Sequence, residues 1–389
     1  MRVLCFVEYY LPGYKSGGPV RSVSNMVEAL GDEIEFRIVA RDRDEGDTSP
    51  YAGVPVDVWH TMGKAAVLHL SPQRVSLGSL RAIIASRDFD VLYLNSLFSP
   101  GFTLRTLLLR RLGAVRHFPV VLAPRGQLLP NALRLKAAKK RAFLAATKLV
   151  GLYRDIVWQA TTAAEVGDIA RTFPNARVEV APNLPMDLAG LGMLPQRPPK
   201  QSGKLRCVFL SRISPKKNLE GALRMLRGVR GEVTFDVCGP LQDTRYWQRC
   251  REMAAELPED IAFRYLGERD HLQVLETLSA YDLFLLPTLS ENFGHVILEA
   301  LVAGCPVLIS DQTPWRDLEA QGVGWDLSLD EPGAFTRALQ SCVDMDEQAH
   351  RRLADRVAQY GRQFARHQHQ EAAALTRELF RSAAADPHR

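Results

Sequence analysis

The sequence has no apolar run long enough to cross a membrane, although 46% of its 389 residues are hydrophobic. A membrane-spanning helix needs about 18 to 20 consecutive apolar residues. The first residues, MRVLCFVEYYLPG, lack the charged leader and the long apolar core of a secretory signal. A chain of this length is long enough for two domains, each with its own buried core. We therefore expect a two-domain protein of the cytoplasm.

Cysteine is scarce and scattered, with six residues and no C-x-x-C pair. Most of the cysteines lie in apolar runs typical of strands, whereas disulfide frameworks and zinc sites need closely paired cysteines. We therefore expect buried, reduced thiols. The six are Cys5, Cys207, Cys238, Cys250, Cys305 and Cys342.

Acidic residues are absent between Asp90 and Asp155. Twelve positive charges lie in this stretch, so the remainder of a chain with net charge +5 carries about −7. Such asymmetry favours an anionic partner: a membrane surface, a phosphate-bearing substrate or nucleic acid. A solvated basic face is the alternative. The stretch contains no recognisable nucleic-acid-binding module, so we expect no nucleic-acid partner. The twelve cations are Arg105, Arg110, Arg111, Arg116, Arg125, Arg134, Lys136, Lys139, Lys140, Arg141, Lys148 and Arg154.

Short apolar runs alternate with segments of helical spacing along the whole chain, a pattern that predicts βαβ units and parallel sheets. The helical segment at residues 20–30 follows the first strand. A stretch dense in Pro, Gly and Lys, residues 184–204, divides the pattern into two halves. The predicted strands are 2–7, 34–40, 90–95, 118–124 and 176–183 in the first half, and 204–211, 233–239, 261–267, 281–287 and 305–311 in the second.

This pattern predicts two Rossmann-like, doubly wound α/β domains. We expect an N-terminal domain at residues 1–184, a linker at 185–203 and a C-terminal domain at 204–355. The last helical stretch is expected at residues 356–389.

Ligands of open α/β sheets bind beyond the carboxyl ends of the strands, so the loops there are candidate sites. After the first strand, Gly17 and Gly18 lead into a helix with Pro19 near its start. Glycines let a backbone approach a ligand, and a helix start favours a phosphate. The loop is not G-x-G-x-x-G, which argues against a dinucleotide-dependent oxidoreductase.

Two further loops carry charge in the second half. Arg212 and Lys217 follow the strand at 204–211 and precede a helix expected to begin near Asn218. Two cations beyond a strand end suit a diphosphate. Glu291 follows the strand at 281–287, and Glu299 lies within the next helix, which is expected to begin at Asn292 or Phe293. At about 1.5 Å of rise per residue, the two carboxylates are too far apart to share one reacting atom.

These three loops, in this order, resemble family 4 of the glycosyltransferases, retaining enzymes of the GT-B fold in which two domains face each other across a cleft. The E-x7-E motif of that family is matched by Glu291 through Glu299, and continues here as LEALVAGCPVLISD. The Arg and Lys five apart are matched by Arg212 and Lys217. The Gly-Gly loop is matched by Gly17 and Gly18.

The resemblance implies that the first domain lies on the acceptor side, that the second binds the nucleotide sugar and that residues 356–389 cross back to the first domain. It also implies roles for the residues of the three loops. Glu299 would bind the ribose of a nucleotide sugar and Glu291 would face the sugar. Arg212 and Lys217 would hold the diphosphate. Backbone amides would assist at Gly17, Gly18, Asn292, Phe293, Gly294 and His295, and Leu266 would lie beside the base.

Two positions depart from the family pattern. Many members have a His after a first-domain strand, where this chain reads APRGQL, so Arg125 is the expected acceptor-side equivalent, with Asn95 near it. The usual Gly after the second-domain Lys is Asn218 here.

The implied reaction is transfer of a sugar, with retention at its anomeric carbon, to a saccharide or lipid-linked acceptor in cell-surface polysaccharide or glycolipid assembly. No metal is expected, because Arg212 and Lys217 neutralise the departing phosphate and no D-x-D lies near the donor. The alternatives are a nucleotide-sugar epimerase of the same fold and a nucleic-acid-binding protein using the basic stretch.

Overall fold

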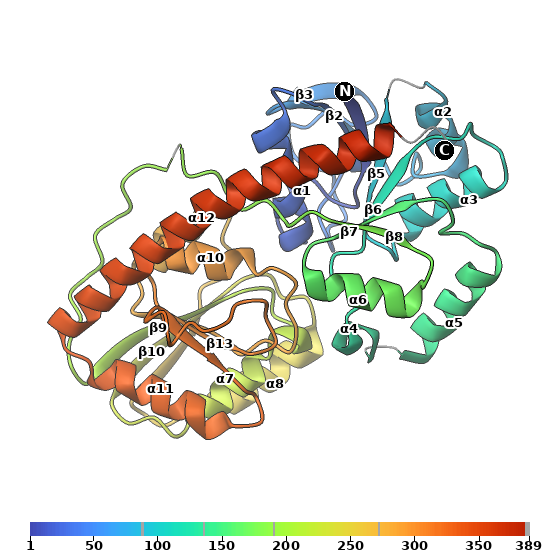
Figure 1. Ribbon diagram of the computed structural model, residues 1–389. Helices are drawn as coiled ribbons and strands as arrows, with labels where there is room; N and C mark the ends of the chain where they lie inside the picture. Colours follow the sequence, from blue (N-terminus) through green and yellow to red (C-terminus); the bar gives the residue numbers. More distant parts are fainter. Residues whose placement is uncertain (87–88, 135–136, 190, 271–272, 386–389) are drawn as a thin grey trace. The chain divides into compact units, whose positions relative to one another are not determined.

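The computed structural model describes residues 1–86, 89–134, 137–189, 191–270 and 273–385. The chain divides into two compact units, which we call unit 1 and unit 2. Unit 1 comprises Met1–Met186 and Gln368–Arg389, and unit 2 comprises Asp187–His367. Helix α12 (Glu347–Ala384), drawn in red in Figure 1, contributes residues to both units. It begins before residue 356, and the predicted linker belongs largely to unit 2.

Unit 1 is an eight-stranded sheet with the order β3-β4-β2-β1-β5-β6-β7-β8, in which β3 alone is antiparallel to its neighbour. Its strands are β1 (Arg2–Phe6), β2 (Glu35–Arg41), β3 (Trp59–Met62), β4 (Ala65–Leu70), β5 (Val91–Asn95), β6 (Val120–Ala123), β7 (Val157–Ala160) and β8 (Arg177–Val180). Its helices are α1 (Gly18–Leu30), α2 (Leu77–Ala85), α3 (Arg105–Arg111), α4 (Pro130–Arg134), α5 (Ala137–Leu149) and α6 (Ala163–Thr172), with a π-helical turn at Pro100–Leu104.

Successive residues of a strand point to opposite faces of its sheet, and strand β1 shows the consequence. Val3 and Cys5 pack into the core on one face, whereas Leu4 and Phe6 pack into the core on the other. Both faces are therefore covered. This explains why β1 is a continuous apolar run in the sequence.

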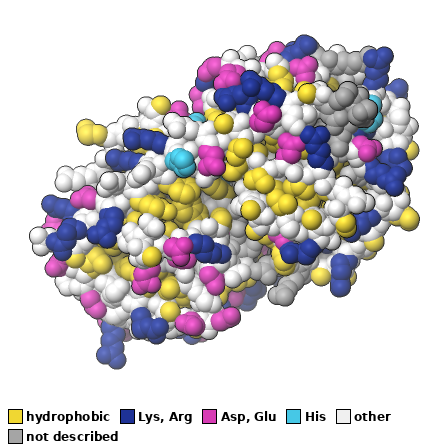
Figure 2. All heavy atoms as spheres, viewed as in Figure 1, with side chains coloured by type: hydrophobic (Ala, Val, Ile, Leu, Met, Phe, Trp, Pro, Cys, Tyr) yellow, Lys and Arg dark blue, Asp and Glu magenta, His cyan; other side chains and the backbone are white. Residues whose placement is uncertain are grey.

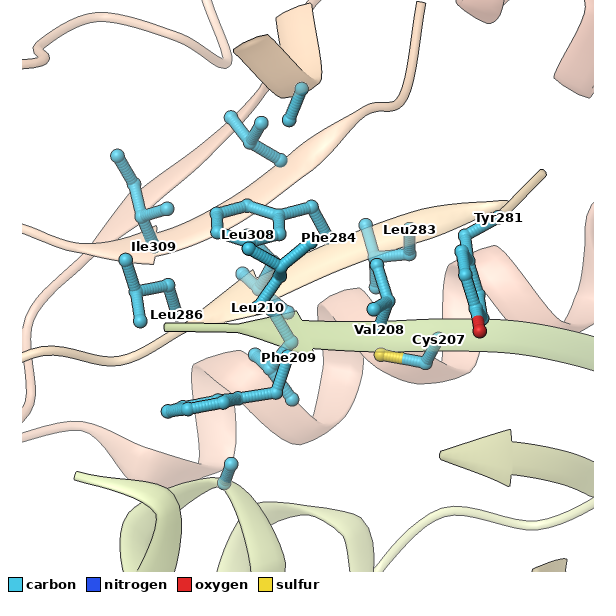
Figure 3. Packing of buried hydrophobic residues seen from close by; sticks show 14 of the residues in the cluster. Cys207, Val208, Phe209, Leu210, Tyr281, Leu283, Phe284, Leu286, Leu308 and Ile309 are labelled. Carbon is cyan, nitrogen blue, oxygen red and sulfur yellow. The ribbon is translucent and has the colours of Figure 1, made fainter. Parts of the chain in front are cut away.

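Unit 2 is a parallel six-stranded sheet with the order β11-β10-β9-β12-β13-β14. Figure 3 shows Phe209, Phe284 and Ile309, from three neighbouring strands of this sheet, packing in the core. The strands are β9 (Lys204–Leu210), β10 (Glu232–Cys238), β11 (Ile261–Tyr265), β12 (Leu283–Leu286), β13 (Val307–Ser310) and β14 (Gly324–Leu327). The helices are α7 (Leu219–Leu226), α8 (Thr244–Ala254), α9 (Gln273–Ser279), α10 (His295–Val302) and α11 (Pro332–Asp344), with a 3-10 turn at Pro215–Lys217.

The predicted α/β class with two parallel-sheet domains is confirmed. All ten predicted strands are present, most of them shorter than predicted. Strands β3, β4, β7 and β14 were not predicted. Two of them bury a polar side chain, His69 in β4 and Gln159 in β7, which interrupts the apolar pattern. Strand β14 begins at Gly324, where a Cβ would lie 2.2 Å from the Val307 carbonyl oxygen of β13.

All six cysteines are free and buried, as predicted. Burial raises the pKa of the Cys342 thiol to about 12, because the thiolate loses its hydration. Within the described ranges, no helix combines the length and the apolar character needed to span a bilayer.

Candidate active site

The candidate site of unit 2 is built at the carboxyl edge of the sheet. The loop after β12 carries Glu291, whose backbone N–H donates to the carbonyl of Gln312, in the loop after β13, over 2.9 Å. Its carboxylate accepts a hydrogen bond from the Lys217 ammonium, in the loop after β9. Both side chains are mostly buried, with 14% of Glu291 and 10% of Lys217 exposed. Three loops thus converge on one ion pair.

The charge of Glu291 is set by its surroundings. Burial, the largest single influence, favours the neutral acid, but the positive charges of Lys217 and Lys216 favour the carboxylate. Hydrogen bonds from Lys217 and from the Asn292 N–H, at 3.2 Å, also favour the carboxylate. Together they lower the pKa of Glu291 to about 2, so this carboxylate is ionised at neutral pH.

The backbone around Asn218 holds Lys217 in place. Asn218 has φ of 60°, a left-handed conformation that Asn tolerates better than most residues and Gly adopts freely. Its side-chain oxygen caps α7 by accepting from the Gly221 N–H at 3.1 Å, and its amide nitrogen donates to Pro287 at 2.8 Å. The replacement of the usual Gly by Asn therefore preserves the turn and adds two hydrogen bonds. Helix α7 begins at Leu219, as predicted.

The loops after β9 and β12 are also joined by their backbones. The Leu289 N–H donates to the Lys216 carbonyl over 2.8 Å, and the Thr288 hydroxyl donates to the same carbonyl over 3.1 Å. Arg212 lies five residues before Lys217 in the loop after β9 and is half-buried. The structure thus places both predicted cations in a loop fastened to the segment that carries Glu291.

Helix α10 begins at His295, so the predicted start at Asn292 or Phe293 is wrong. The reason is Gly294, whose φ of 79° cannot continue a helix. A Cβ at this position would lie 2.7 Å from Cδ1 of Ile297 and 3.1 Å from Cγ of Glu291. The Phe293 carbonyl accepts from the Trp315 indole over 2.7 Å, which fixes the loop before the helix. The amides at the helix start carry the positive end of its dipole.

Glu299 lies in α10 just over one turn from its first residue, and is buried with 4% of its surface exposed. Leu266 directly follows β11, and its carbonyl accepts from the Arg269 guanidinium over 2.7 Å. The next residue, Gly267, accepts from the Gly239 N–H over 2.9 Å, which ties the ends of β10 and β11 together. The sequence analysis missed Arg269 and Gly239. Gly239 is the last residue of the predicted strand 233–239, and a Gly at the end of a strand was the signal for it.

In unit 1, Gly17 forms the N-cap of α1 with φ of 68°, and Gly18 is the first helical residue. The loop before them is held by Asp44, which is 4% exposed. Its carboxylate accepts from the N–H groups of Tyr14 at 2.6 Å and Lys15 at 3.0 Å. Asp44 was missed by the sequence analysis, because no local pattern marks a carboxylate that reaches thirty residues back along the chain.

Arg125 is in direct contact with Asn95 in unit 1, where its Nε donates to Oδ1 over 2.8 Å. The same guanidinium donates to the Tyr93 hydroxyl over 2.6 Å and to the Asn183 side chain. Tyr93 in turn donates to Gln159 over 2.8 Å. Asn95 ends β5, Arg125 follows β6 and Asn183 follows β8. Tyr93 and Gln159 lie within β5 and β7, so one polar network joins four strands of the sheet. Asn183 was not predicted, although it follows a strand much as Asn95 ends one.

In the part of the chain that the structure describes, no group of three His, Cys, Asp or Glu residues is placed to hold a metal ion. The predicted residues form two sets. Lys217, Glu291, Gly294 and Glu299, with the loops of Arg212 and Leu266, belong to unit 2. Gly17, Gly18, Asn95 and Arg125 belong to unit 1.

Comparison with known protein families finds one match for each half of the chain. Residues 194–364 match the glycosyl transferases group 1, and residues 17–184 match the glycosyl transferase 4-like domain. The chain is a member of the family 4, group 1 glycosyltransferases. The resemblance seen in the sequence is thus confirmed at the level of the family.

Relatives of this glycosyltransferase chain match only in part. It is 28% identical over 115 residues to D-inositol 3-phosphate glycosyltransferase of Corynebacterium glutamicum, which covers 29% of the chain and 27% of the relative. It is 30% identical over 142 residues to phosphatidyl-myo-inositol mannosyltransferase of Mycobacterium leprae, which covers 36% of the chain and 37% of the relative. The alignments therefore span about a quarter to a third of the curated relatives.

Solved structures match the fold over almost the whole chain. Sucrose-phosphate synthase from Thermosynechococcus elongatus has a TM-score of 0.69 at 15% identity, covering 98% of this chain and 99% of that one. Anabaena HepE, solved with UDP and glucose, has a TM-score of 0.66 at 16% identity, covering 97% and 100%. At such low identity these matches show the fold alone, which is the GT-B fold.

Proposed function

We propose that the chain is a retaining glycosyltransferase. It transfers a sugar, a hexose in our proposal, from a nucleoside diphosphate to a hydroxyl group of a saccharide or lipid-linked acceptor. The observation that carries the proposal is the Lys217–Glu291 ion pair, held at the carboxyl edge of the unit 2 sheet directly before the N-terminus of α10. An ammonium, a carboxylate and a helix start together suit a ligand with both an anionic and a hydroxyl-rich part.

In this proposal Arg212 and Lys217 bind the diphosphate, assisted by the amides near Phe293 to His295. Glu299 accepts the ribose hydroxyls and Glu291 faces the sugar. The Lys217 ammonium donates a hydrogen bond to the Glu291 carboxylate in the structure. Donor binding therefore redirects part of the hydrogen bonding of Lys217 from this carboxylate to the phosphate. Within unit 1, the helix start at Gly17 and Gly18 suits a phosphate, and Arg125 with Asn95 is the proposed acceptor-side pair.

The reaction then proceeds on the front face of the sugar. The bond between the anomeric carbon and the phosphate oxygen breaks, giving an oxocarbenium-like state, and the acceptor oxygen forms the new bond on the same face. The acceptor proton passes to the departing phosphate. Arg212 and Lys217 stabilise the charge on that phosphate, and the Glu291 carboxylate stabilises the positive charge on the sugar. In this scheme the cationic side chains do the work that a metal ion does elsewhere.

A panel of UDP-, GDP- and other nucleotide sugars tests the donor class by thermal stabilisation. A ligand at 100 times its dissociation constant adds about 2.7 kcal/mol to the free energy of unfolding. We expect one base and one sugar to stand out, and product NMR with that donor to show retained anomeric configuration. The proposal fails if no nucleotide sugar stabilises the protein, and an inverted product refutes the mechanism.

We further propose that unit 1 contacts an anionic membrane surface from the cytoplasmic side, as suits a lipid-linked acceptor in cell-surface polysaccharide or glycolipid assembly. The ends of α3 and α5 lie together, because the Arg111 guanidinium donates to the Val150 carbonyl over 2.9 Å. Three large aliphatic side chains are exposed there: Leu112 by 71%, Leu149 by 88% and Val150 by 53%. In Figure 2, dark blue Lys and Arg side chains lie on the α3 and α5 side of this unit.

Cations beside exposed aliphatic side chains are typical of a surface that inserts shallowly into an anionic interface. The side chain of Arg134 and residue Lys136, both counted in the sequence, lie outside the described residues.

Membrane contact is tested by flotation with lipid vesicles at low salt. We expect the protein to float with vesicles containing anionic lipid and the L112E/L149E variant to remain below. As a control, Leu241→Glu, at an exposed leucine of unit 2, should float like the parent. A parent protein that stays free of the vesicles disproves membrane contact.

A further inference from the structure

A cavity of about 440 Å³ lies within unit 2, at the edge of the sheet opposite to Glu291. Its wall includes Ser279, which precedes β12, and Ala303 with Gly304, which precede β13. Glu291 instead follows β12. Segments before and after parallel strands lie at opposite edges of a sheet, so this cavity is separate from the proposed donor site.

The cavity exists because small residues face a proline-rich segment. Ala354 and Ala358, one turn apart on α12, lie against Gly304. A Cβ on Gly304 would be 3.0 Å from the Ala354 carbonyl and 3.3 Å from the Ala358 Cβ, so the helix backbone approaches closely there. The other wall is the segment 193–200, in which three prolines remove backbone donors. The volume is in the range of small-molecule sites.

Two of the side chains that line the cavity already have hydrogen-bond partners, which hold this part of its wall in place. The Lys200 ammonium donates to the carbonyls of Val343 at 3.2 Å and Met345 at 3.1 Å, among others. The His350 ring nitrogen Nε2 contacts the Asp282 carbonyl at 3.0 Å. Burial lowers the pKa of His350, so this ring is neutral at pH 7. The remaining charge of the cavity comes from its other residues.

Three arginines and two carboxylates supply that charge: Arg197, Arg351, Arg362, Glu347 and Asp355. One of these carboxylates is already paired within the cavity wall, since Arg351 donates to Glu347 over 2.6 Å. Arg197 donates through Nη2 to the Ala303 carbonyl over 3.2 Å, at the end of α10. Its Nε is buried without a hydrogen-bond partner among the described residues. A guanidinium N–H in this situation lacks an acceptor, and guanidinium geometry matches phosphate oxygens.

We propose that this cavity binds a small phosphate-bearing anion, of the size of a sugar phosphate, through Arg197, Arg351 and Arg362. The phosphate oxygens accept from the guanidinium groups of these three lining residues. The organic part of the ligand lies along the apolar wall of Pro195, Ala354 and Ala358. This site does not depend on the proposed glycosyl transfer, and its occupation needs no nucleotide.

The test is calorimetric titration of the full chain with glucose 6-phosphate, inorganic phosphate and glucose. It uses a Lys217→Ala background so that phosphate binding at the proposed donor site is reduced. We expect both phosphate compounds to bind with 1:1 stoichiometry and glucose to give no heat. Adding Arg362→Gln, at an exposed position of the cavity rim, should weaken the binding at least tenfold. Adding Ala358→Glu, which places a carboxylate in the cavity, should abolish it.

The matched control is Arg352→Gln, at an exposed arginine of the same helix that does not line the cavity, and it should bind like its parent. Circular dichroism identifies any variant that fails to fold, and Arg362→Gln alone decides the matter if Ala358→Glu does not fold. The proposal is overturned if the Lys217→Ala protein binds neither phosphate compound. It is equally overturned if Arg362→Gln and Arg352→Gln bind them with the same affinity, since the anion then lies elsewhere.

Discussion

Glu291→Ala is expected to lower kcat by about 10² to 10³, comparable to the loss of one preorganised electrostatic contact. In our proposal Glu291 faces the sugar where positive charge develops, so its carboxylate stabilises the transition state more than the bound donor. The affinity for the free nucleoside diphosphate should hardly fall, because Lys217 remains and loses only its partner on Glu291. Steady-state kinetics with the donor found by stabilisation, together with nucleotide titration, measures both quantities.

Glu291→Gln separates charge from shape in the same experiment. It keeps the volume of the side chain but removes its charge, so we expect it to lose most of the activity that Glu291→Ala loses. Since the pKa of Glu291 is about 2, the carboxylate is ionised throughout the working range. The ratio of parent to variant kcat should therefore be constant between about pH 5 and 9. A ratio that changes with an apparent pKa near 6 contradicts the ionised state found here.

The same lowered pKa links Glu291 to acid stability. It lies below the ordinary value of 4.5, so the ionised carboxylate stabilises the fold above about pH 4.5. This contribution is lost as the pH falls toward 2. Activity measurements should therefore stay above that window.

Glu299→Ala should act mainly on donor binding, with a rise in the donor KM of roughly 10- to 100-fold, the range for a lost hydrogen bond to a charged group. A carboxylate that holds the ribose binds ground state and transition state about equally, so kcat at saturating donor should change little. Inhibition by the free nucleoside diphosphate should weaken in parallel. Donor KM, kcat and inhibition constants are all available from one set of initial rates.

Because Glu299 is buried, its truncation also leaves a space within α10's packing. Glu299→Gln preserves the volume and serves as the control: it should unfold near the parent temperature and still bind donor more weakly. If Glu291→Ala abolished nucleotide binding while Glu299→Ala retained it, the roles of the two carboxylates would have been assigned the wrong way round.

How far the sequence predicted the fold can be seen in individual strands. Strand β1 was found because both of its faces are buried, which makes it continuously apolar. Strand β7 was missed because Gln159, although 3% exposed, is polar. Its side chain is satisfied by Tyr93 and by the Ala181 carbonyl at 2.7 Å, and both partners are distant in sequence. A local pattern cannot show that a buried polar residue has such partners.

Of the candidate site, too, the sequence predicted one part and missed another. The E-x7-E spacing and the Arg–Lys spacing locate Glu291 and Lys217 after strands, and general rules for parallel sheets put both at one edge. The start of α10 was placed too early, because helical spacing does not show that Gly294 adopts φ of 79°. Asp44 and Asn183 went unnoticed because their partners are fixed only when distant strands pair.

The sequence by itself determined the α/β class, the division into two sheets, the family and the identity of the charged residues at the strand ends. The class and the two sheets follow from apolar periodicity, which is local along the chain, and the family follows from the resemblance of its motifs to known ones. The tertiary structure decided which charges meet and in what state. Lys217 and Glu291 are 74 residues apart, and the pairing of β9 with β12 brings their loops together in a poorly hydrated place. That proximity, together with Lys216 and the Asn292 amide, keeps a buried carboxylate ionised.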